Sequence, residues 1–419
     1  MRRINTWSKL DRSAWLLLLE NGLFAVATAL SGTFVNVFLW KIKKDWSMIS
    51  WFNLIHFVVA ALTFVVAGWM VKKVDRVVSI RLGVAILSLF YLVVWLLGKN
   101  AAAYVYLLGA LLGLGAGFFW LAYNVLYFEI TERDNRDIFN GANGLITSIT
   151  GIAAPFISGL LIRNMGQVRG YHFIFGLSLS IFLAAVVVSF LFKSRLARGE
   201  FQLARVVRLL GKRDAHWRYV GLAMAAQGLR EGVFSFLISL LVYVTTKDEF
   251  TVGSFYTVGS LVSMLSYFVV GKMMKPKSRN LFILVGALMM GLVILPFAFH
   301  MSEWTMWVMG VGGALFYPFY LAPLTSTVFD VIGETEQSAA LRVEYVVSRE
   351  LMLNVGRVTG ILLFILWVAQ IKDPTELRWF VLVIGFTQLL TWLAIRKVPL
   401  VGRAKKRLPA NPAHQGTGR

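Results

Sequence analysis

Residues 48–71 read MISWFNLIHFVVAALTFVVAGWMV and contain no Asp, Glu, Lys or Arg. A helix that spans a bilayer needs about 20 predominantly apolar residues, so this stretch is long enough to cross once. Backbone amides in lipid must be hydrogen-bonded within their own structure, which a helix achieves inside a single segment. The stretch also lacks the short alternation that is typical of a transmembrane β-barrel. It therefore predicts a transmembrane α-helix.

Runs of the same kind recur along the whole chain. Together with the first they make twelve, at residues 14–39, 48–71, 77–97, 101–128, 141–162, 173–192, 219–244, 252–274, 281–300, 304–329, 345–369 and 377–395. Each run is close to or above the length that one crossing requires. The sequence therefore predicts an all-α polytopic membrane protein with twelve transmembrane helices.

The composition excludes several other classes of protein. Of the 419 residues, 58% are hydrophobic and 15% are charged, whereas soluble domains average about 45–50% apolar and about 25% charged residues. A formal net charge of +21 would suggest a nucleic-acid partner in a soluble protein, but this apolar content argues against one. The chain has no cysteine and no Walker A, metalloprotease or Gly-x-Ser-x-Gly motif. We therefore expect no enzyme, no cofactor and no metal site.

The basic residues are unevenly distributed between the predicted loops. With a cytoplasmic N-terminus, about 31 of the 42 Lys and Arg residues fall on the cytoplasmic side, as the positive-inside rule requires. Lys41, Lys43 and Lys44 are a local exception, and Arg230 and Arg357 lie inside spans. We expect a multi-pass protein of the cell membrane with both termini in the cytoplasm.

The most basic internal loop, residues 193–218, reads as a cytoplasmic linker between an N-terminal bundle, residues 1–192, and a C-terminal bundle, residues 219–396. Residues 397–419 form a polar tail that we expect to be disordered in the cytoplasm. A shift of 203 residues aligns the two bundles and matches identical residues in them. The matches include Phe52 with Phe255, Gly68 with Gly271, Arg76 with Arg279 and Gly83 with Gly286. Two parallel six-helix repeats are typical of transporters that rock around a site near the bilayer midplane.

Over about residues 12–396 the chain resembles the major facilitator superfamily. The family signature between helices two and three is matched by Gly68, Arg76 and Gly83, while Lys72 and Asp75 occupy the positions of its usual Asp and second glycine. The resemblance implies a latch at a cytoplasmic gate. The residues that we assign to this gate are Gly68, Lys72, Asp75, Arg76, Glu129, Asp330 and Glu350.

Two other segments bear on direction and coupling. Residues 154–159, APFISG, resemble the Gly-Pro-x-x-Gly-Gly motif of antiporters, which favours export. Many proton-coupled members carry an arginine on the fourth helix, but Gly109 occupies that position here, so the role of that arginine is not carried over.

Charged side chains inside spans are costly, about 2.5–3.5 kcal/mol each on insertion scales, and mark candidate functional positions. Arg230 and Glu231 lie about 18 Å into the seventh helix, near the bilayer middle. They either bind substrate and relay protons or form a structural ion pair. Glu350, Asn354 and Arg357 form one stripe on the eleventh helix. The stripe either reaches the cavity or locks that helix against a neighbour.

Glu20 and Asn21 lie near the start of the first helix. Glu20 is a candidate proton carrier because burial disfavours a charged carboxylate, and the alternative is a carboxylate that faces cytoplasmic water. Aromatic and amide side chains on the fourth and tenth helices either pack against neighbours or favour a bulky, partly apolar or cationic substrate. The expected substrate and proton pathway comprises Glu20, Asn21, Trp120, Tyr123, Asn124, Arg230, Glu231, Tyr317, Tyr320, Asn354 and Arg357.

These patterns predict secondary active transport of a small molecule by alternating access. We expect coupling to protons through Glu20 and Glu231, a preference for export, contact with membrane lipids and a monomeric protein. The alternatives are a lipid flippase or scramblase on the same fold, and a transport-inactive membrane scaffold or sensor.

Overall fold

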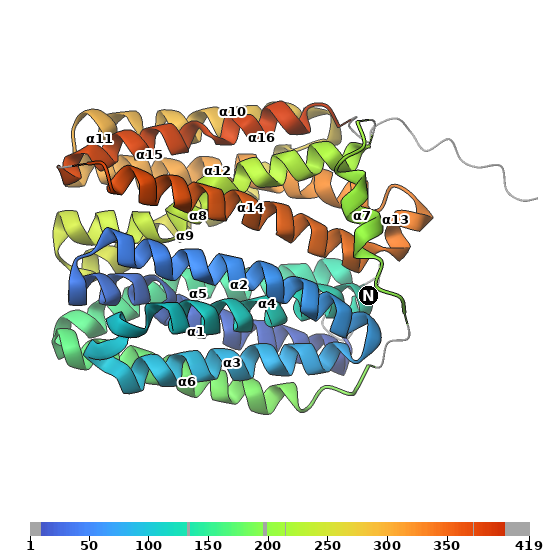
Figure 1. The fold of residues 1–419 in the computed structure, drawn as a ribbon, viewed down its shortest axis with the longest axis horizontal. Helices are drawn as coiled ribbons and strands as arrows, with labels where there is room; N and C mark the ends of the chain where they lie inside the picture. The colour runs from blue at the N-terminus through green and yellow to red at the C-terminus, as the bar shows by residue number, and fades with distance from the viewer. Residues whose placement is uncertain (1–9, 132–134, 196–198, 214, 372, 399–419) are drawn as a thin grey trace, which may run out of the picture.

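The computed structural model describes residues 10–131, 135–195, 199–213, 215–371 and 373–398, and this part of the chain contains helices and no strand (Figure 1). Eleven helical segments in these ranges are long and apolar enough to cross a membrane. One of them, Arg76–Ile130, is 55 residues long and folds back at the 3₁₀ helix η2 (Gly98–Tyr104), so it crosses twice. The predicted all-α, multi-pass membrane fold is confirmed. Residues 399–419, most of the predicted tail, lie outside the described residues.

The first six spans are α1 (Arg12–Lys43), α2 (Trp46–Lys73), α3 (Arg76–Leu97), α4 (Val105–Ile130), α5 (Arg136–Met165) and α6 (Gln167–Ser189). The other six are α8 (His216–Thr246), α9 (Glu249–Met273), α10 (Arg279–Leu292) with α11 (Leu295–Phe299), α12 (Glu303–Ile332), α14 (Arg342–Val368), and α15 (Leu377–Phe386) with α16 (Gln388–Ile395). The connections contain α7 (Leu203–Leu209), α13 (Glu336–Ala340), η3 (Pro276–Ser278) and η4 (Pro374–Glu376).

The ninth and twelfth spans differ from the single helices that the sequence predicts. The ninth is interrupted between Leu292 and Leu295, just before Pro296, which lacks the backbone N–H that a continuous helix requires. The twelfth is interrupted at Thr387. Each interruption lasts one or two residues, so both spans still cross as single elements.

The turn between the first two helices of each six-helix set is built in the same way. Lys44 and Lys247 adopt the left-handed conformation, with φ of 51° and 53°, and end α1 and α8. The next residues, Asp45 and Asp248, accept hydrogen bonds from backbone N–H groups of α2 and α9. An Asp at this position satisfies donors that have no partner within the helix. Lys44 and Lys247 are 203 residues apart, so the turn follows the sequence repeat.

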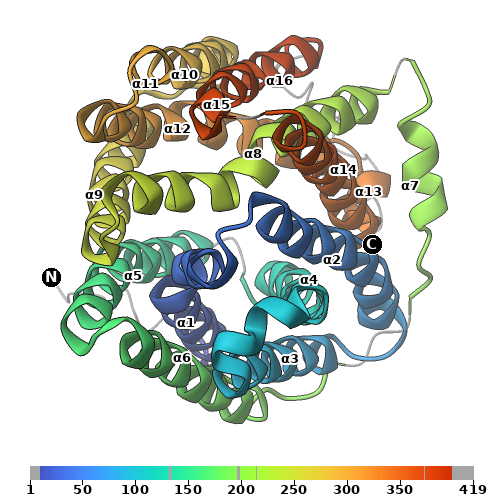
Figure 2. The same cartoon turned by 60° about the vertical axis from the view of Figure 1, so that its left-hand side comes forward.

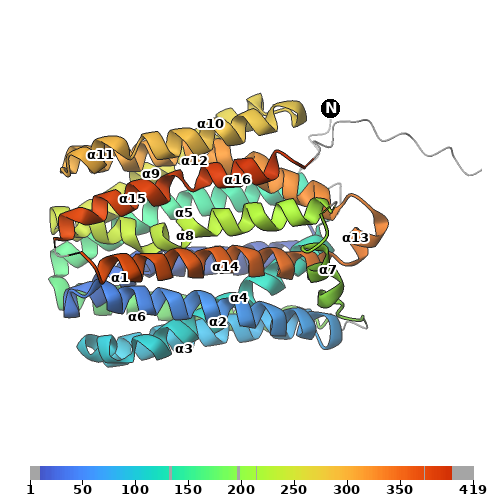
Figure 3. The ribbon, with the colours of Figure 1, turned by 45° about the horizontal axis from the view of Figure 1, so that its top comes forward.

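The spans form two groups, α1 to α6 and α8 to α16, which we call the N-terminal and C-terminal halves (Figure 2). The halves meet where α2 packs on α14, α5 on α9 and α1 on α8. The segment that joins them runs along the outside and carries α7. The end of the molecule at which α7 and α13 lie is called the linker end, and the other is called the opposite end (Figures 1 and 3).

Glycines allow α8 and α14 to approach until their backbones touch. A Cβ atom added at Gly228, Gly356 or Gly360 would lie no more than 2.2 Å from a backbone carbonyl oxygen of the facing helix. Only a residue without a side chain fits there, as at small-residue crossings of membrane helices. We call these positions the glycine seam. It brings side chains on either side of the crossing, including Glu231 and Arg357, within reach of each other.

The linker is attached to the N-terminal half through Asp75. Its carboxylate accepts hydrogen bonds from the Ser194 hydroxyl and from the Arg195 backbone N–H, the latter at 3.1 Å. It also caps α3 through the Val77 N–H at 2.7 Å. Burial acts to raise the pKa of Asp75, but these hydrogen bonds outweigh it and hold the pKa below its ordinary value. The anchoring is therefore present at neutral pH and is lost only when the pH falls through the lowered pKa.

The glycine seam yields a stability prediction. Gly356→Ala places a methyl group against the Ala225 carbonyl oxygen, so α8 and α14 must separate. We expect a loss of about 1–3 kcal/mol, the usual cost of overpacking, measured by thermal unfolding of the purified protein in detergent. Gly271→Ala is the control, because a Cβ there meets nothing within 4 Å. Equal melting temperatures for the two variants would contradict the seam.

Candidate functional site

Two adjoining cavities lie between the halves, near the middle of the spans. One has a volume of about 510 Å³ and the other about 430 Å³, and both are lined by Trp120, Arg349 and Glu350. We call them together the central cavity. From the N-terminal half its walls include Phe24, Thr28, His56, Phe57, Trp120 and Asn124, and from the C-terminal half Met224, Gln227, Glu231, Tyr317, Arg349, Glu350, Asn354 and Arg357.

A hydrogen-bonded ion pair between Glu231 and Arg357 lies at the wall of this cavity. It joins α8 to α14 across the glycine seam. Gln227, one turn before Glu231, donates to its second carboxylate oxygen at 3.1 Å. Arg357 also donates to the Asn354 side-chain oxygen at 3.1 Å. The four side chains therefore hold each other in fixed orientations, as a partly buried charge pair requires.

Glu350 extends this network toward the linker end. It pairs with Arg349, and its other oxygen lies 3.8 Å from an Arg357 nitrogen. The sequence analysis assigned Glu350 to the gate, whereas in the structure it lines the central cavity. The reason is helical geometry, since Glu350 lies two turns from Arg357 on the same face of α14. The result is an alternating row of two carboxylates and two guanidinium groups.

The N-terminal half presents mostly aromatic side chains to this row of charges. The Arg357 guanidinium lies over the Phe57 ring, 5.0 Å from its centroid, a favourable cation–π geometry. His56 packs its ring on Phe57 and makes no hydrogen bond among the described residues. Trp120 and Asn124 of α4 complete this wall. The cavity thus combines a charged wall with a largely aromatic one.

Several predicted pathway residues lie elsewhere. Arg230 faces a separate cavity of about 190 Å³ inside the C-terminal half, with its guanidinium 4.2 Å from the Phe234 ring centroid. Tyr320 is buried and donates to the Thr391 hydroxyl at 3.0 Å. Tyr317 lines both the Arg230 cavity and the central cavity. Arg230 and Glu231 are consecutive residues of α8, and here their side chains line different cavities.

The N-terminal candidates are also dispersed. Glu20 is fully buried, and neither carboxylate oxygen has a hydrogen-bond partner among the described residues. Asn21 donates to Asn143 of α5 at 2.7 Å. Tyr123 is buried in an aromatic cluster with Phe119 and Trp120. These residues pack inside the N-terminal half, and the cavities described here do not include them in their walls.

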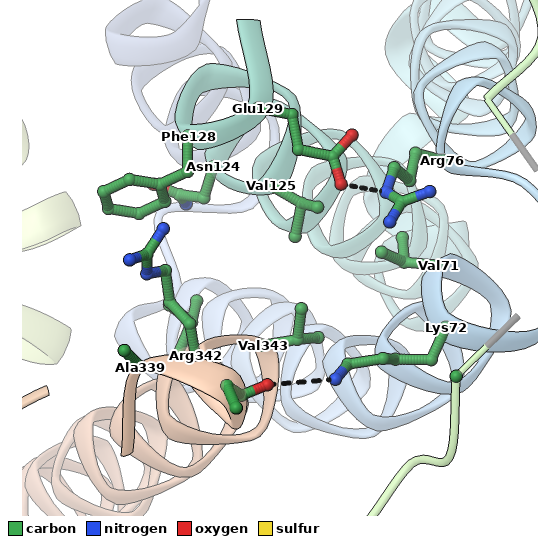
Figure 4. A pocket seen from close by; sticks show the side chains of 13 residues that line it. Val71, Lys72, Arg76, Asn124, Val125, Phe128, Glu129, Ala339, Arg342 and Val343 are labelled. Atoms are coloured by element: carbon green, nitrogen blue, oxygen red, sulfur yellow. Dashed lines mark hydrogen bonds and ion pairs between the residues drawn. The ribbon is translucent and has the colours of Figure 1, made fainter. Parts of the chain in front are cut away.

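A third cavity, of about 300 Å³, lies between the halves at the linker end (Figure 4). Lys72 of α2 pairs with Glu344 of α14 at 3.3 Å and reaches the Ala340 carbonyl oxygen at 3.5 Å. Glu344 also accepts from the Gln202 N–H of the linker at 3.1 Å. Gly68 is in close contact, since a Cβ there would lie 2.9 Å from atoms of Phe201 and Val347. Helices of both halves and the linker meet at this contact.

Each half also carries an ion pair of its own beside this contact at the linker end. Arg76 pairs with Glu129 in the N-terminal half, and Arg279 pairs with Asp330 in the C-terminal half. Arg76 and Arg279 are related by the 203-residue repeat, and each acid lies near the end of the fourth helix of its set. Asp75 lies beside the first pair, where it anchors the linker.

The opposite end is closed by an ion pair that the sequence analysis missed. Lys41 of α1 pairs with the buried carboxylate of Glu249 on α9. Its ammonium lies over the rings of Tyr171 and Tyr243, at 5.4 Å and 5.3 Å from their centroids. Tyr171 donates to the same Glu249 carboxylate at 3.4 Å. The available signal was the local exception that Lys41 makes to the loop-charge rule.

Other cavity residues were not among the predicted pathway positions. Gln227 precedes Glu231 by one turn and Arg349 precedes Arg357 by two, so helical spacing from each flagged charge could have found them. Phe24, Thr28 and Phe57 carry no signal that separates them from packing residues. Within the described residues, no group of three or more His, Cys, Asp or Glu side chains is arranged to hold a metal ion.

The fold and the cavity define a class: a multi-pass helical membrane protein of two six-span halves with a charged cavity between them. Comparison with known families then specifies it. The family model of the Major Facilitator Superfamily matches residues 22–348, and the chain belongs to this family of secondary transporters.

Two relatives are similar over long stretches. One is the uncharacterized protein YqgE of Bacillus subtilis (strain 168), which is 40% identical over 390 residues, covering 93% of this chain and 90% of that protein. The other is an uncharacterized protein encoded in the sodM 3′ region of Geobacillus stearothermophilus, 42% identical over 174 residues, covering 42% of this chain and 81% of that protein.

The ion network predicts a rescue experiment. Arg357→Gln leaves Glu231 and Glu350 without their shared partner, so we expect a loss of about 2–4 kcal/mol in thermal unfolding. Adding Glu231→Gln removes the orphaned charge and should restore part of that loss. Arg163→Gln is the control, because its side chain is 58% exposed and 3.9 Å from Asp248. If the double variant loses more stability than the two single variants lose together, the pairing is contradicted.

Proposed function

We propose that this protein is a proton-coupled secondary transporter of a small molecule in the cell membrane, working by alternating access with a preference for export. The observation that carries the proposal is the Glu231–Arg357–Glu350 network at a cavity between two halves that meet at both ends. Charges of this kind at membrane depth are expensive and accompany substrate or ion pathways. The linker end, with its basic loops, is the cytoplasmic side in this proposal.

Glu231 is the acid that we assign to proton binding. Its carboxylate pairs with Arg357, and a proton bound to Glu231 would remove the negative charge that this pair requires. A substrate group that engages Arg357 would therefore compete with Glu231 for the same partner. The titratable and charged groups that share this environment are Arg357, Glu350, Arg349, His56 and Tyr317. Glu20 is a second buried acid, and it does not line the central cavity.

Alternating access requires closures that open one at a time. Lys72–Glu344 joins the halves at the linker end and Lys41–Glu249 joins them at the opposite end. In both pairs the N-terminal half supplies the cation and the C-terminal half supplies the acid. Breaking either pair exposes the central cavity to one side, while the other pair keeps the far side closed.

The absence of cysteine makes this motion directly measurable. Spin labels on Lys73→Cys and Gln337→Cys report the linker end, and labels on Lys43→Cys and Thr245→Cys report the opposite end, because all four side chains are exposed. We expect double electron–electron resonance spectroscopy to show two distance populations for each pair of labels. When the distance at one end increases, the distance at the other end should decrease. Glu344→Gln should favour opening at the linker end, and Glu249→Gln at the opposite end. Single unchanging distances at both ends would favour a transport-inactive scaffold.

The same spin labels test whether the conformational change is coupled to proton binding. We expect the balance of the two populations to change between mildly alkaline and mildly acidic pH, and Glu231→Gln to hold it near the acidic position at either pH. Glu20→Gln is the matched control, a buried acid outside the central cavity. A normal pH response in Glu231→Gln would remove Glu231 from the coupling mechanism, and its loss in Glu20→Gln instead would transfer the role.

A further inference from the structure

Three arginines follow one another along α14. Arg342, Arg349 and Arg357 are spaced by seven and eight residues, about two helical turns, so they lie within one broad face of the helix and about 10–12 Å apart. Each guanidinium lies over an aromatic ring, with centroid distances of 4.7 Å to Phe128, 5.8 Å to Phe329 and 5.0 Å to Phe57 respectively. We call these three residues the arginine row.

The arginine row connects two cavities. Arg342 lines the cavity at the linker end, and Arg349 and Arg357 line the central cavity. Asn124 of α4 lines both, so the two cavities are neighbours along the same interface between the halves. A molecule that moves from the linker end to the middle of the membrane along this interface therefore meets the three guanidinium groups in order.

Among the described residues, the arginines at the middle of this path pair with carboxylates, whereas Arg342 at the linker end does not. Arg349 and Arg357 share Glu350 and Glu231. Lys72 pairs with Glu344 and Arg76 with Glu129. Within the described residues, no carboxylate lies within ion-pair distance of Arg342, which extends beside Phe128 on the other side of the cavity from Lys72 (Figure 4). A cleft with an excess of one charge concentrates ions of the opposite sign.

We propose that the substrate is a small organic anion, a carboxylate or phosphate bearing an apolar ring or chain, and that Arg342 is its first binding residue at the linker end. This inference rests on the proposed function and specifies its substrate class. A guanidinium stacked on a ring keeps its N–H edge free for two parallel hydrogen bonds to an anion. Phe24, Phe57 and Trp120 offer surface for the apolar part. A cationic substrate, which the aromatic stripes also allowed, would meet three arginines.

The test uses probes that share one ring and differ in charge. Phenylacetate, phenyl phosphate, 2-phenylethanol and 2-phenylethylamine are titrated into the purified full-length protein, and binding is followed by thermal shift. We expect the two anions to stabilise the protein and the alcohol and amine to do so at least about tenfold more weakly, as the loss of a charge-assisted pair implies. The proposal is overturned if all four probes stabilise the protein equally or if none does. It is also overturned if the amine stabilises the protein more than the anions do.

Variants then locate the contact. Arg342→Gln should weaken anion binding about tenfold and Arg342→Lys by less, because a lysine keeps the charge and loses the paired geometry. Arg163→Gln, an exposed arginine at the opposite end, should bind as the unaltered protein does. Unchanged anion binding in Arg342→Gln would overturn the role of Arg342.

Transport is measured separately, so the two proposals fail in different ways. Proteoliposomes are loaded with the anion that binds, and counterflow of its radiolabelled form is recorded. Anion binding without counterflow, together with unchanging spin-label distances, would overturn the proposed transport function and leave the anion site standing. Alternating distances without any preference for anions would leave transport standing and overturn the substrate class.

Discussion

Glu231 and Arg357 meet because no side chain separates α8 from α14. The seam of glycines lets the two backbones touch, and this contact sets the distance between every group that the helices carry toward the cavity. A bilayer penalises a lone charge, so two charges at this depth are stable only if their helices hold them together. The charged wall of the central cavity therefore depends on that crossing.

The duplicated halves share their framework and differ in their chemistry. The Lys-Asp turn after the first helix and the arginine–acid pair at the linker end occur in both. The charged network, by contrast, belongs entirely to α8 and α14 of the C-terminal half, while the N-terminal half supplies aromatic rings and amides. The two halves therefore share an architecture, and the charged part of the site lies in only one of them.

The sequence was sufficient for the fold, because each span must be long and apolar on its own. It also marked Glu231 and Arg357 as unusual, since charge at membrane depth is rare. It could not show that they are partners, nor that Arg230 faces another cavity, because the direction of a side chain depends on which helix packs where. Lys41 illustrates the same limit, since its partner Glu249 lies 208 residues away. Glu350 was assigned to the gate by sequence position, and the turns of α14 carry it to the cavity.

The location of the network within a single half constrains any mechanism. In the proposed mechanism, rocking the halves separates α2 from α14, α5 from α9 and α1 from α8, but it leaves α8 and α14 together, so the Glu231–Arg357 pair is kept when access changes. What changes is the surface that the pair faces, since Phe57, Trp120 and Asn124 belong to the other half. In this proposal, the pair is broken by a group that competes for Arg357 or by a proton on Glu231, while the ion pairs at the two ends control access. The contact between Arg357 and Phe57 then joins the ion pair to the other half.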